Sequence, residues 1–175
     1  MYITPQQLLE RYNAGERNFA GIRFFPDTCR EPVLEDADLS NIILSGAYLP
    51  RIKLSLANLR NSNLAGAYMR DAELIETDLH ETDLTGANLQ DACLSGTDIA
   101  RSLLTAANLR GAKLEGADFT NVDLSESILC QVDFSEVRIV NRFGDRFIYC
   151  PYALLWQMTM PDGTYIEGPQ YDYSF

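Results

Sequence analysis

Basic residues are scarce in this chain of 175 residues. Lys and Arg number 14 against 25 Asp and Glu, so the formal net charge is −11. DNA, RNA and anionic membranes are bound through basic surface that displaces their counterions. The composition therefore argues against direct contact with nucleic acid or a membrane, and it leaves a basic protein partner open.

The sequence also lacks the features of an exported or membrane-spanning protein. Residues 1–7 carry neither a basic start nor an apolar run, and no stretch approaches the ~18 apolar residues of a membrane span. Cys29, Cys93, Cys130 and Cys150 are too scattered for a disulfide framework and form no Cys-x-x-Cys pair. We expect a cytoplasmic protein with reduced thiols.

Histidine is the scarcest of the catalytic residue types, with His80 alone, directly after Leu79. A Ser-His-Asp or Cys-His site needs its histidine in a pocket beside a nucleophile, and a zinc site needs several Cys or His ligands at suitable spacing. The sequence offers neither arrangement. We expect no catalytic residue, no metal and no cofactor, with His80 in contact with solvent at the surface.

What the sequence has instead is a repeat of five residues, in which one apolar residue recurs 22 times. These central residues are Leu34, Leu39, Leu44, Leu49, Leu54, Leu59, Leu64, Met69, Leu74, Leu79, Leu84, Leu89, Leu94, Ile99, Leu104, Leu109, Leu114, Phe119, Leu124, Leu129, Phe134 and Ile139. Five residues advance an α-helix by about 140° and reverse the face of a strand, so neither element keeps the series on one side. The chain must turn a corner every five residues if all central residues point inward.

A second period, of 20 residues, indicates how many corners close one coil. Asp78, Asp98 and Asp118 recur at this spacing, as do Tyr48 and Tyr68. Four sides of five residues therefore make a square coil.

The interior of each coil is predicted from the central residue and from the residue two positions before it. The latter is alanine in ten repeats and serine or threonine in six, with Ile42 and Ile52 as larger exceptions. One coil of the predicted core consists of Leu79, Leu84, Leu89 and Leu94. Each buried Leu contributes roughly 1.5–3 kcal/mol, so the central column is the main source of stability.

This pattern resembles the pentapeptide-repeat family, whose repeat is Ala-Asp/Asn-Leu followed by two polar residues. Segments that match it well are Ala87-Asn-Leu-Gln-Asp, Ala107-Asn-Leu-Arg-Gly and Ala117-Asp-Phe-Thr-Asn. The resemblance implies an all-β fold, a right-handed quadrilateral β-helix. We expect a single domain over residues 1–175, with a helical cap at 1–18, repeats at 19–141 and a C-terminal cap at 142–175.

The N-terminal end of such a solenoid needs a cap, because it exposes strand edges and an apolar cross-section. Thr4 as N-cap, with Gln7 as its capping-box partner, predicts a helix over residues 5–13 that lies on the first coil. Two prolines within residues 26–32 predict a loop that bulges from this coil. The repeat extends backwards through Phe19, Phe24 and Cys29.

After the repeat ends at Gly144, residues 143–175 hold nine of the chain's aromatic residues. We expect an aromatic lid over the last coil; a docking or dimer surface is the alternative, since Tyr and Trp are frequent interface anchors. A Pro-Asp-Gly turn with Gly163 at positive φ resembles the ends of cyanobacterial members of the family. Cys130 and Cys150 would stack only if the coil register survived past Gly144. The sequence leaves open whether the chain is a monomer or a homodimer.

Acidic residues offer one candidate functional surface, since Asp38, Asp78, Asp98 and Asp118 are expected to stack on one face. The preferred interpretation is that Asp is simply the solvent-exposed residue that the family usually has at this position. The second interpretation is that a cation binds between the stacked carboxylates. The third is an acidic DNA mimic acting on a type II topoisomerase such as DNA gyrase, as in some pentapeptide-repeat relatives. Residues 34–139 carry about one net charge per 3 Å, against one per ~1.7 Å in duplex DNA, so this prism is a weak decoy.

Apolar residues at solvent-facing positions offer the other candidate surface. Ile43, Tyr48 and Tyr68 occupy two adjacent columns, and Leu103 and Ile128 follow further along the same columns. A contiguous exposed apolar patch of several hundred Å² marks an interaction site. We therefore expect a non-enzymatic protein-binding or scaffold protein whose partner is another protein.

Overall fold

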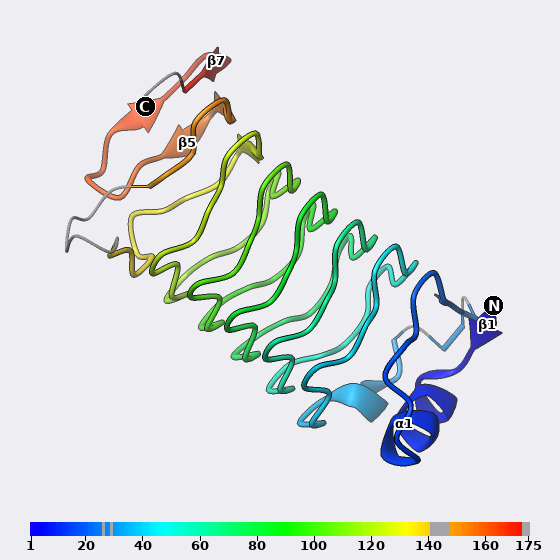
Figure 1. Cartoon of the computed structure of the whole chain (residues 1–175). Helices are drawn as coiled ribbons and strands as arrows, with labels where there is room; N and C mark the ends of the chain where they lie inside the picture. Colours follow the sequence, from blue (N-terminus) through cyan, green and yellow to red (C-terminus); the bar gives the residue numbers. More distant parts are fainter. Residues whose placement is uncertain (26, 29, 141–147, 173–175) are drawn as a thin grey trace.

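Stacked coils form the body of the molecule, and the two ends of the chain lie at opposite ends of the stack (Figure 1). The computed structural model describes residues 1–25, 27–28, 30–140 and 148–172. Parallel bridges join residues 20 positions apart through the repeats, as between Asp38 and Asn58 or Leu103 and Asp123. These bridges confirm the 20-residue coil predicted from the sequence.

Each repeat closes with a β-turn that begins at the central residue. In the repeat of Leu84, the Ala87 amide donates to the Leu84 carbonyl at 2.9 Å, and Gly86 between them has φ +64°. A positive φ at the third residue is what a type II turn requires. The same sign recurs at every fifth residue from Asp36 to Gln131, at fourteen non-glycine residues and six glycines. One left-handed residue per repeat therefore makes each corner of the coil.

Leu56 provides a test of these corners, because it combines φ +64° with a side chain that is 53% exposed. The left-handed conformation costs an ordinary L-residue about 1–2 kcal/mol, whereas glycine's extra chain entropy costs roughly 0.5–1 kcal/mol. We expect Leu56→Gly to raise the free energy of unfolding by about 0.5–1 kcal/mol in urea denaturation. Ser55→Gly, at the neighbouring turn position without positive φ, should lower it; equal effects of the two variants would contradict this account of the corners.

Neighbouring coils are joined by one bridged residue on each side. The Leu84 amide donates to the Leu103 carbonyl at 2.8 Å, and the Leu103 amide donates back to Thr82 at 3.1 Å. Because each side is this short, named strands occur only near the two ends of the described chain. They are β1 (Tyr2–Ile3), β2 (Arg23–Phe24), β3 (Ile128–Cys130), β4 (Leu154–Trp156), β5 (Met158–Thr159), β6 (Tyr165–Ile166) and β7 (Gln170–Tyr171).

The core consists of the central residues and the small residues two positions before them, as predicted. The representative set Leu79, Leu84, Leu89 and Leu94 is fully buried. In one column of small residues, four successive coils carry fully buried alanines, which are Ala47, Ala67, Ala87 and Ala107. Elsewhere a buried hydroxyl takes this place and donates to a carbonyl of the preceding coil, as Thr82 Oγ1 does to Leu59 at 2.8 Å. Ser62, Thr77, Thr97 and Ser102 donate in the same way.

The N-terminal cap is the helix α1 (Pro5–Asn13), within the bounds predicted from the sequence. Thr4 Oγ1 accepts the Gln7 amide at 3.1 Å, and Gln7 Oε1 accepts the Thr4 amide at 2.9 Å, which completes the capping box. Leu8 is fully buried, and the Tyr12 hydroxyl donates to the Ser40 carbonyl at 2.7 Å. These contacts place α1 on the first coil, as expected.

The first coil is five residues longer than the others. Asn18 is bridged to Ile43, a separation of 25, and β1 pairs in parallel with β2. Phe19 and Phe24 are buried as expected. They align with residues 25 positions later in the chain, one side of the coil beyond the alignment that a strict period of 20 predicts. The extra residues lie between Phe24 and the short 3₁₀-helix η1 (Pro32–Leu34), where a bulge was predicted. Cys29 lies outside the described residues.

The C-terminal segment continues the stack and then folds back. β3 pairs in parallel with β4 at a separation of 26, β4 pairs antiparallel with β7, and β5 pairs antiparallel with β6. The predicted turn joins β5 to β6, with Gly163 at φ +85°. Gly144, the predicted end of the repeat, lies outside the described residues.

The expectation of an aromatic lid is wrong for the five aromatic residues that the structure describes, while Phe143, Phe147, Tyr173 and Phe175 lie outside the described residues. Small and aliphatic side chains bury the last coil, namely Ile148, Cys150, Ala153, Leu155 and Met158. The described aromatic residues of the segment are exposed to solvent. They are Tyr149, Tyr152, Trp156, Tyr165 and Tyr171. Inward positions of the stack can hold aromatic rings, as Phe119 and Phe134 show, but in this segment aliphatic and small residues occupy them.

The division of the chain at residues 18 and 141 stays a prediction, since residues 141–147 are outside the described part. Within the described residues, no helix is long and apolar enough to cross a membrane.

Candidate functional site

The apolar residues of the predicted partner surface lie in the two columns expected. Ile43, Asn63, Asp83 and Leu103 are bridged in one column, and Tyr48, Tyr68, Asn88, Asn108 and Ile128 in the other. Ile43, Tyr48 and Leu103 are exposed, while Tyr68 and Ile128 are half-buried. Polar residues separate Leu103 and Ile128 from the others by three coils, or about 14 Å. The five residues therefore do not form one continuous patch, and only Tyr48 and Tyr68 are in direct contact.

Tyr48 and Tyr68 form a stacked pair on the outside of neighbouring coils. Their ring centroids are 4.9 Å apart with an interplanar angle of 14°, and Tyr48 is 41% exposed. Arg23 continues the column below them, with its guanidinium 5.2 Å from the Tyr48 ring centroid. Tyr2 of β1 is the next residue of this column, because it pairs with Arg23.

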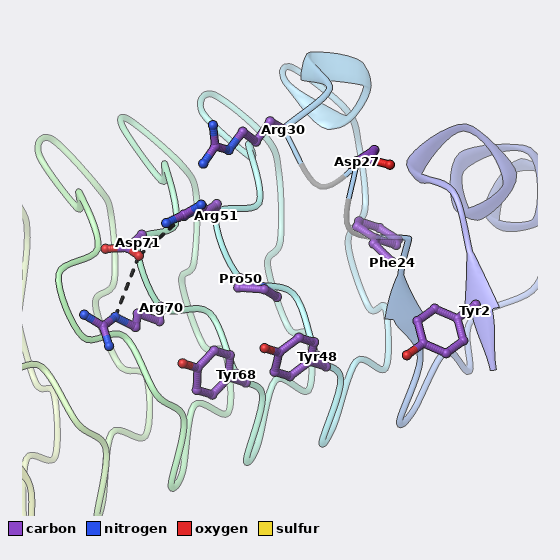
Figure 2. A pocket seen from close by; sticks show the side chains of 10 residues that line it. All are labelled: Tyr2, Phe24, Asp27, Arg30, Tyr48, Pro50, Arg51, Tyr68, Arg70 and Asp71. Carbon is purple, nitrogen blue, oxygen red and sulfur yellow. Dashed lines mark ion pairs between the residues drawn. The ribbon is translucent and has the colours of Figure 1, made fainter.

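A groove of about 880 Å³ runs past these tyrosines (Figure 2). Figure 2 shows Tyr48 and Tyr68 side by side, with Arg51, Asp71 and Arg70 beside them and with Asp27 and Arg30 on the segment before η1. The remaining lining residues are Tyr2, Phe24 and Pro50. The longer first coil therefore supplies one side of the groove.

Charges in the groove differ from those of the whole chain. Three arginines face two aspartates among its lining residues, in a chain of net charge −11. Asp71 Oδ2 lies 3.7 Å from both Arg51 Nε and Arg70 Nε, and Arg70 also contacts Asp91 at 3.2 Å. Arg30 forms no ion pair with any residue in the described ranges. Arg51 and Arg70 were not predicted from the sequence, because they lie at turn positions and not in a column of outward residues.

The acidic column has a local structural role. Asp38, Asp78, Asp98 and Asp118 stack in one column as predicted, with Asn58 between the first two. In each of them one carboxylate oxygen accepts the backbone amide two residues later, at 2.9–3.1 Å. Asp and Asn before the central residue therefore hold the start of the turn, which supports the interpretation as an ordinary feature of the repeat.

Two arginines partly neutralise this column, and an asparagine amide donates a hydrogen bond to it. Asn58 Nδ2 donates to Asp38 at 3.2 Å, Arg60 lies 3.0 Å from Asp78, and Arg138 lies 3.4 Å from Asp118. The hydrogen bond to Asp78 raises the pKa of Arg60. The column is therefore less negative than its aspartates alone imply.

His80 is not the solvated residue expected from the sequence. Its side chain is only 18% exposed, with Nδ1 3.6 Å from Asp98 Oδ1 and Nε2 3.7 Å from Glu81 Oε1. Nδ1 is buried without a hydrogen-bond partner among the described residues. Glu81 and, from the next coil, Asp98 therefore flank the ring.

The three described cysteines are free thiols. Cys130 pairs in register with Trp156, whereas the Leu124 amide donates to Tyr149 and so aligns Leu124 with Cys150. The six extra residues before β4 thus shift the register, and Cys130 and Cys150 do not occupy one column. Burial raises the pKa of the Cys150 thiol, and its hydrogen bond to Asp172 at 3.2 Å raises it further. Among the described residues no group of His, Cys, Asp and Glu is suited to a metal ion.

The coils, corners and inward residues together define a solenoid of five-residue repeats. The family model for pentapeptide repeats matches residues 33–71, 52–91, 62–99 and 98–136, which together span more than half of the chain. The chain belongs to the pentapeptide repeat family. No protein with a curated description matches it.

Three solved structures illustrate the similarity. A pentapeptide repeat protein from the thylakoid lumen of Arabidopsis thaliana is 32% identical, over 54% of this chain and 70% of that chain, with a TM-score of 0.47. One from the cyanobacterium Nostoc is 31% identical, over 79% and 87%, with a TM-score of 0.23. A form of QnrB1, a plasmid-mediated fluoroquinolone resistance protein, is 15% identical, over 82% and 62%, with a TM-score of 0.58. The resemblance to cyanobacterial members is thus confirmed, and the similarity to QnrB1 concerns the fold.

Proposed function

We propose that this protein is a non-enzymatic binding scaffold, a right-handed quadrilateral β-helix that captures another protein near its N-terminal end. The observation that supports this proposal most strongly is the stack of Tyr48 and Tyr68 on the outside of the coils, beside a groove lined by three arginines. Pentapeptide repeat proteins are generally structural or binding proteins. Tyrosine and arginine are the residue types most enriched at energetically dominant interface positions.

The middle of the stack offers no comparable group at Leu103. This residue lies between Asp83 and Asp123 of the neighbouring coils, and single exposed apolar residues are normal on soluble proteins. At the N-terminal end, by contrast, Tyr2, Tyr48 and Tyr68 share one column and one groove. A cytoplasmic location stays a prediction.

Replacing both Tyr48 and Tyr68 with serine tests the proposal. We expect the double variant to keep its circular dichroism spectrum and to lose the proteins that cross-link to the wild-type chain, identified by mass spectrometry. The matched control is Ile75→Ser, which removes an exposed apolar side chain on another side of the coil. The proposal fails if the double variant and the control capture the same proteins as the wild type.

The acidic DNA mimic acting on a type II topoisomerase stays an alternative prediction. The pairing of Asp78 and Asp118 with arginines reduces the negative field that such a mimic needs. We therefore expect no inhibition of DNA supercoiling by DNA gyrase at concentrations at which the scaffold captures its partner. Inhibition that disappears on Asp78→Asn and Asp118→Asn would favour the mimic over the scaffold.

A further inference from the structure

We propose that the groove of Tyr48 and Tyr68 binds an extended, proline-containing acidic segment of its partner. This inference rests on the proposed function and goes beyond it by specifying the ligand chemistry. Three features of the groove support it, which are its length, its aromatic rings and its arginines.

The length of the groove fits a short extended segment. From Tyr2 to Tyr68 the column rises through three coil spacings, or about 14 Å. A polyproline II segment of about four or five residues, at ~3.1 Å per residue, spans the same length.

Aromatic rings line one side of the groove. The rings of Tyr48 and Tyr68 are stacked nearly parallel to each other, and the Tyr2 ring lies 5.5 Å from that of Phe25 at the other end of the column. Pro50 adds a rigid apolar side chain to the lining. Proline-rich segments dock in aromatic-lined grooves of this kind, and their preformed conformation limits the entropy lost on binding.

The arginines select the charge of the occupant. Arg51 has a side chain 57% exposed and only a 3.7 Å contact with Asp71, and exposed pairs of this kind are weak. Arg30, on the opposite side of the groove, has no ion pair with any described residue. Both guanidinium groups can therefore receive carboxylates, which arginine binds with two parallel hydrogen bonds. A basic segment would instead meet three arginines in a small space.

Fluorescence anisotropy with labelled peptides of about ten residues tests the inference. The probe alternates proline with glutamate, and two comparison peptides alternate proline with lysine and glycine with glutamate. We expect the wild-type protein to bind the proline–glutamate peptide at least about tenfold more tightly than either comparison peptide. Equal binding of the lysine peptide would overturn the charge preference, and equal binding of the glycine peptide would overturn the proline preference.

Variants then assign the binding to the groove. Tyr68→Ser and Arg51→Glu are each expected to weaken binding of the proline–glutamate peptide by about tenfold or more. Glutamate is tolerated at a left-handed corner, as Glu76 and Glu81 show, so Arg51→Glu should fold. Leu103→Ser, outside the groove, is the control that should leave binding unchanged. Unchanged binding by both groove variants would overturn the inference.

The two proposals can fail separately. If no peptide binds, yet capture of a partner is lost in the Tyr48→Ser, Tyr68→Ser double variant, then this inference is wrong and the scaffold function stands. If the double variant retains both partner capture and peptide binding, the proposed function and the inference are both wrong.

Discussion

Leu84→Asp is expected to abolish the stable fold of the repeats, whereas Leu103→Asp should leave it nearly intact. The two leucines belong to neighbouring coils and are joined by a hydrogen bond between the Leu84 amide and the Leu103 carbonyl. Leu84 is fully buried and Leu103 is 49% exposed. The same substitution therefore compares an inward side chain with an outward side chain in neighbouring coils.

The expected loss at Leu84 exceeds about 5 kcal/mol. Removing a buried leucine side chain costs roughly 2–5 kcal/mol, and an unpaired carboxylate in an apolar interior costs several more. The total stability of a domain is only about 5–15 kcal/mol. Urea denaturation followed by circular dichroism should show loss of the cooperative transition for Leu84→Asp, with Leu103→Asp within about 0.5 kcal/mol of wild type. Comparable losses in the two variants would contradict the assignment of inside and outside.

Ala87→Leu is expected to destabilise the protein by about 3 kcal/mol, by overpacking. Ala87 lies in the column of buried alanines, with Ala67 and Ala107 in the neighbouring coils at a spacing of about 4.8 Å. A leucine there adds three heavy atoms between coils whose separation is fixed by hydrogen bonds. Cores that cannot expand lose roughly 1–3 kcal/mol, and occasionally more, on such insertions.

Ala65→Leu is the matched control for this prediction, since Ala65 is half-buried at a turn position. The equivalent position of another repeat already carries Ile75, so a large apolar residue is tolerated there. Chemical denaturation should place this variant within about 0.5 kcal/mol of wild type. A Leu at position 87 with wild-type stability would show that coils can separate locally, contrary to the tight column described above.

The repeats could be predicted from the sequence because each five-residue unit carries its own evidence. An apolar residue, a small residue two positions before it and a polar residue between them fix which side chains point inward. The alignment of columns such as Tyr48 with Tyr68 then follows from four corners per coil. Larger residues at the inward small positions, such as Ile42 and Val122, occur toward the ends of the stack, where the neighbouring coil is irregular.

The ends and the groove could not be predicted in the same way. The sequence indicates an interruption at both places, but it does not indicate that five residues are added in the first coil and six before β4, so the register of Phe19 and of Cys150 could not be derived. Tyr2 precedes the repeats, and its place in the tyrosine column depends on the pairing of β1 with β2. The burial of His80 depends on Asp98, which approaches it diagonally from the next coil.

One left-handed corner in every five residues makes this fold modular in quarter turns. An insertion or deletion of 20 residues within the repeats changes the height of the molecule and leaves every later side chain on its original face. An insertion of five residues without a bulge rotates everything after it by one side, so a later column such as that of Asp78 would move to another face. Gene duplications can therefore add whole coils to the stack beside the groove, while the groove itself keeps its orientation.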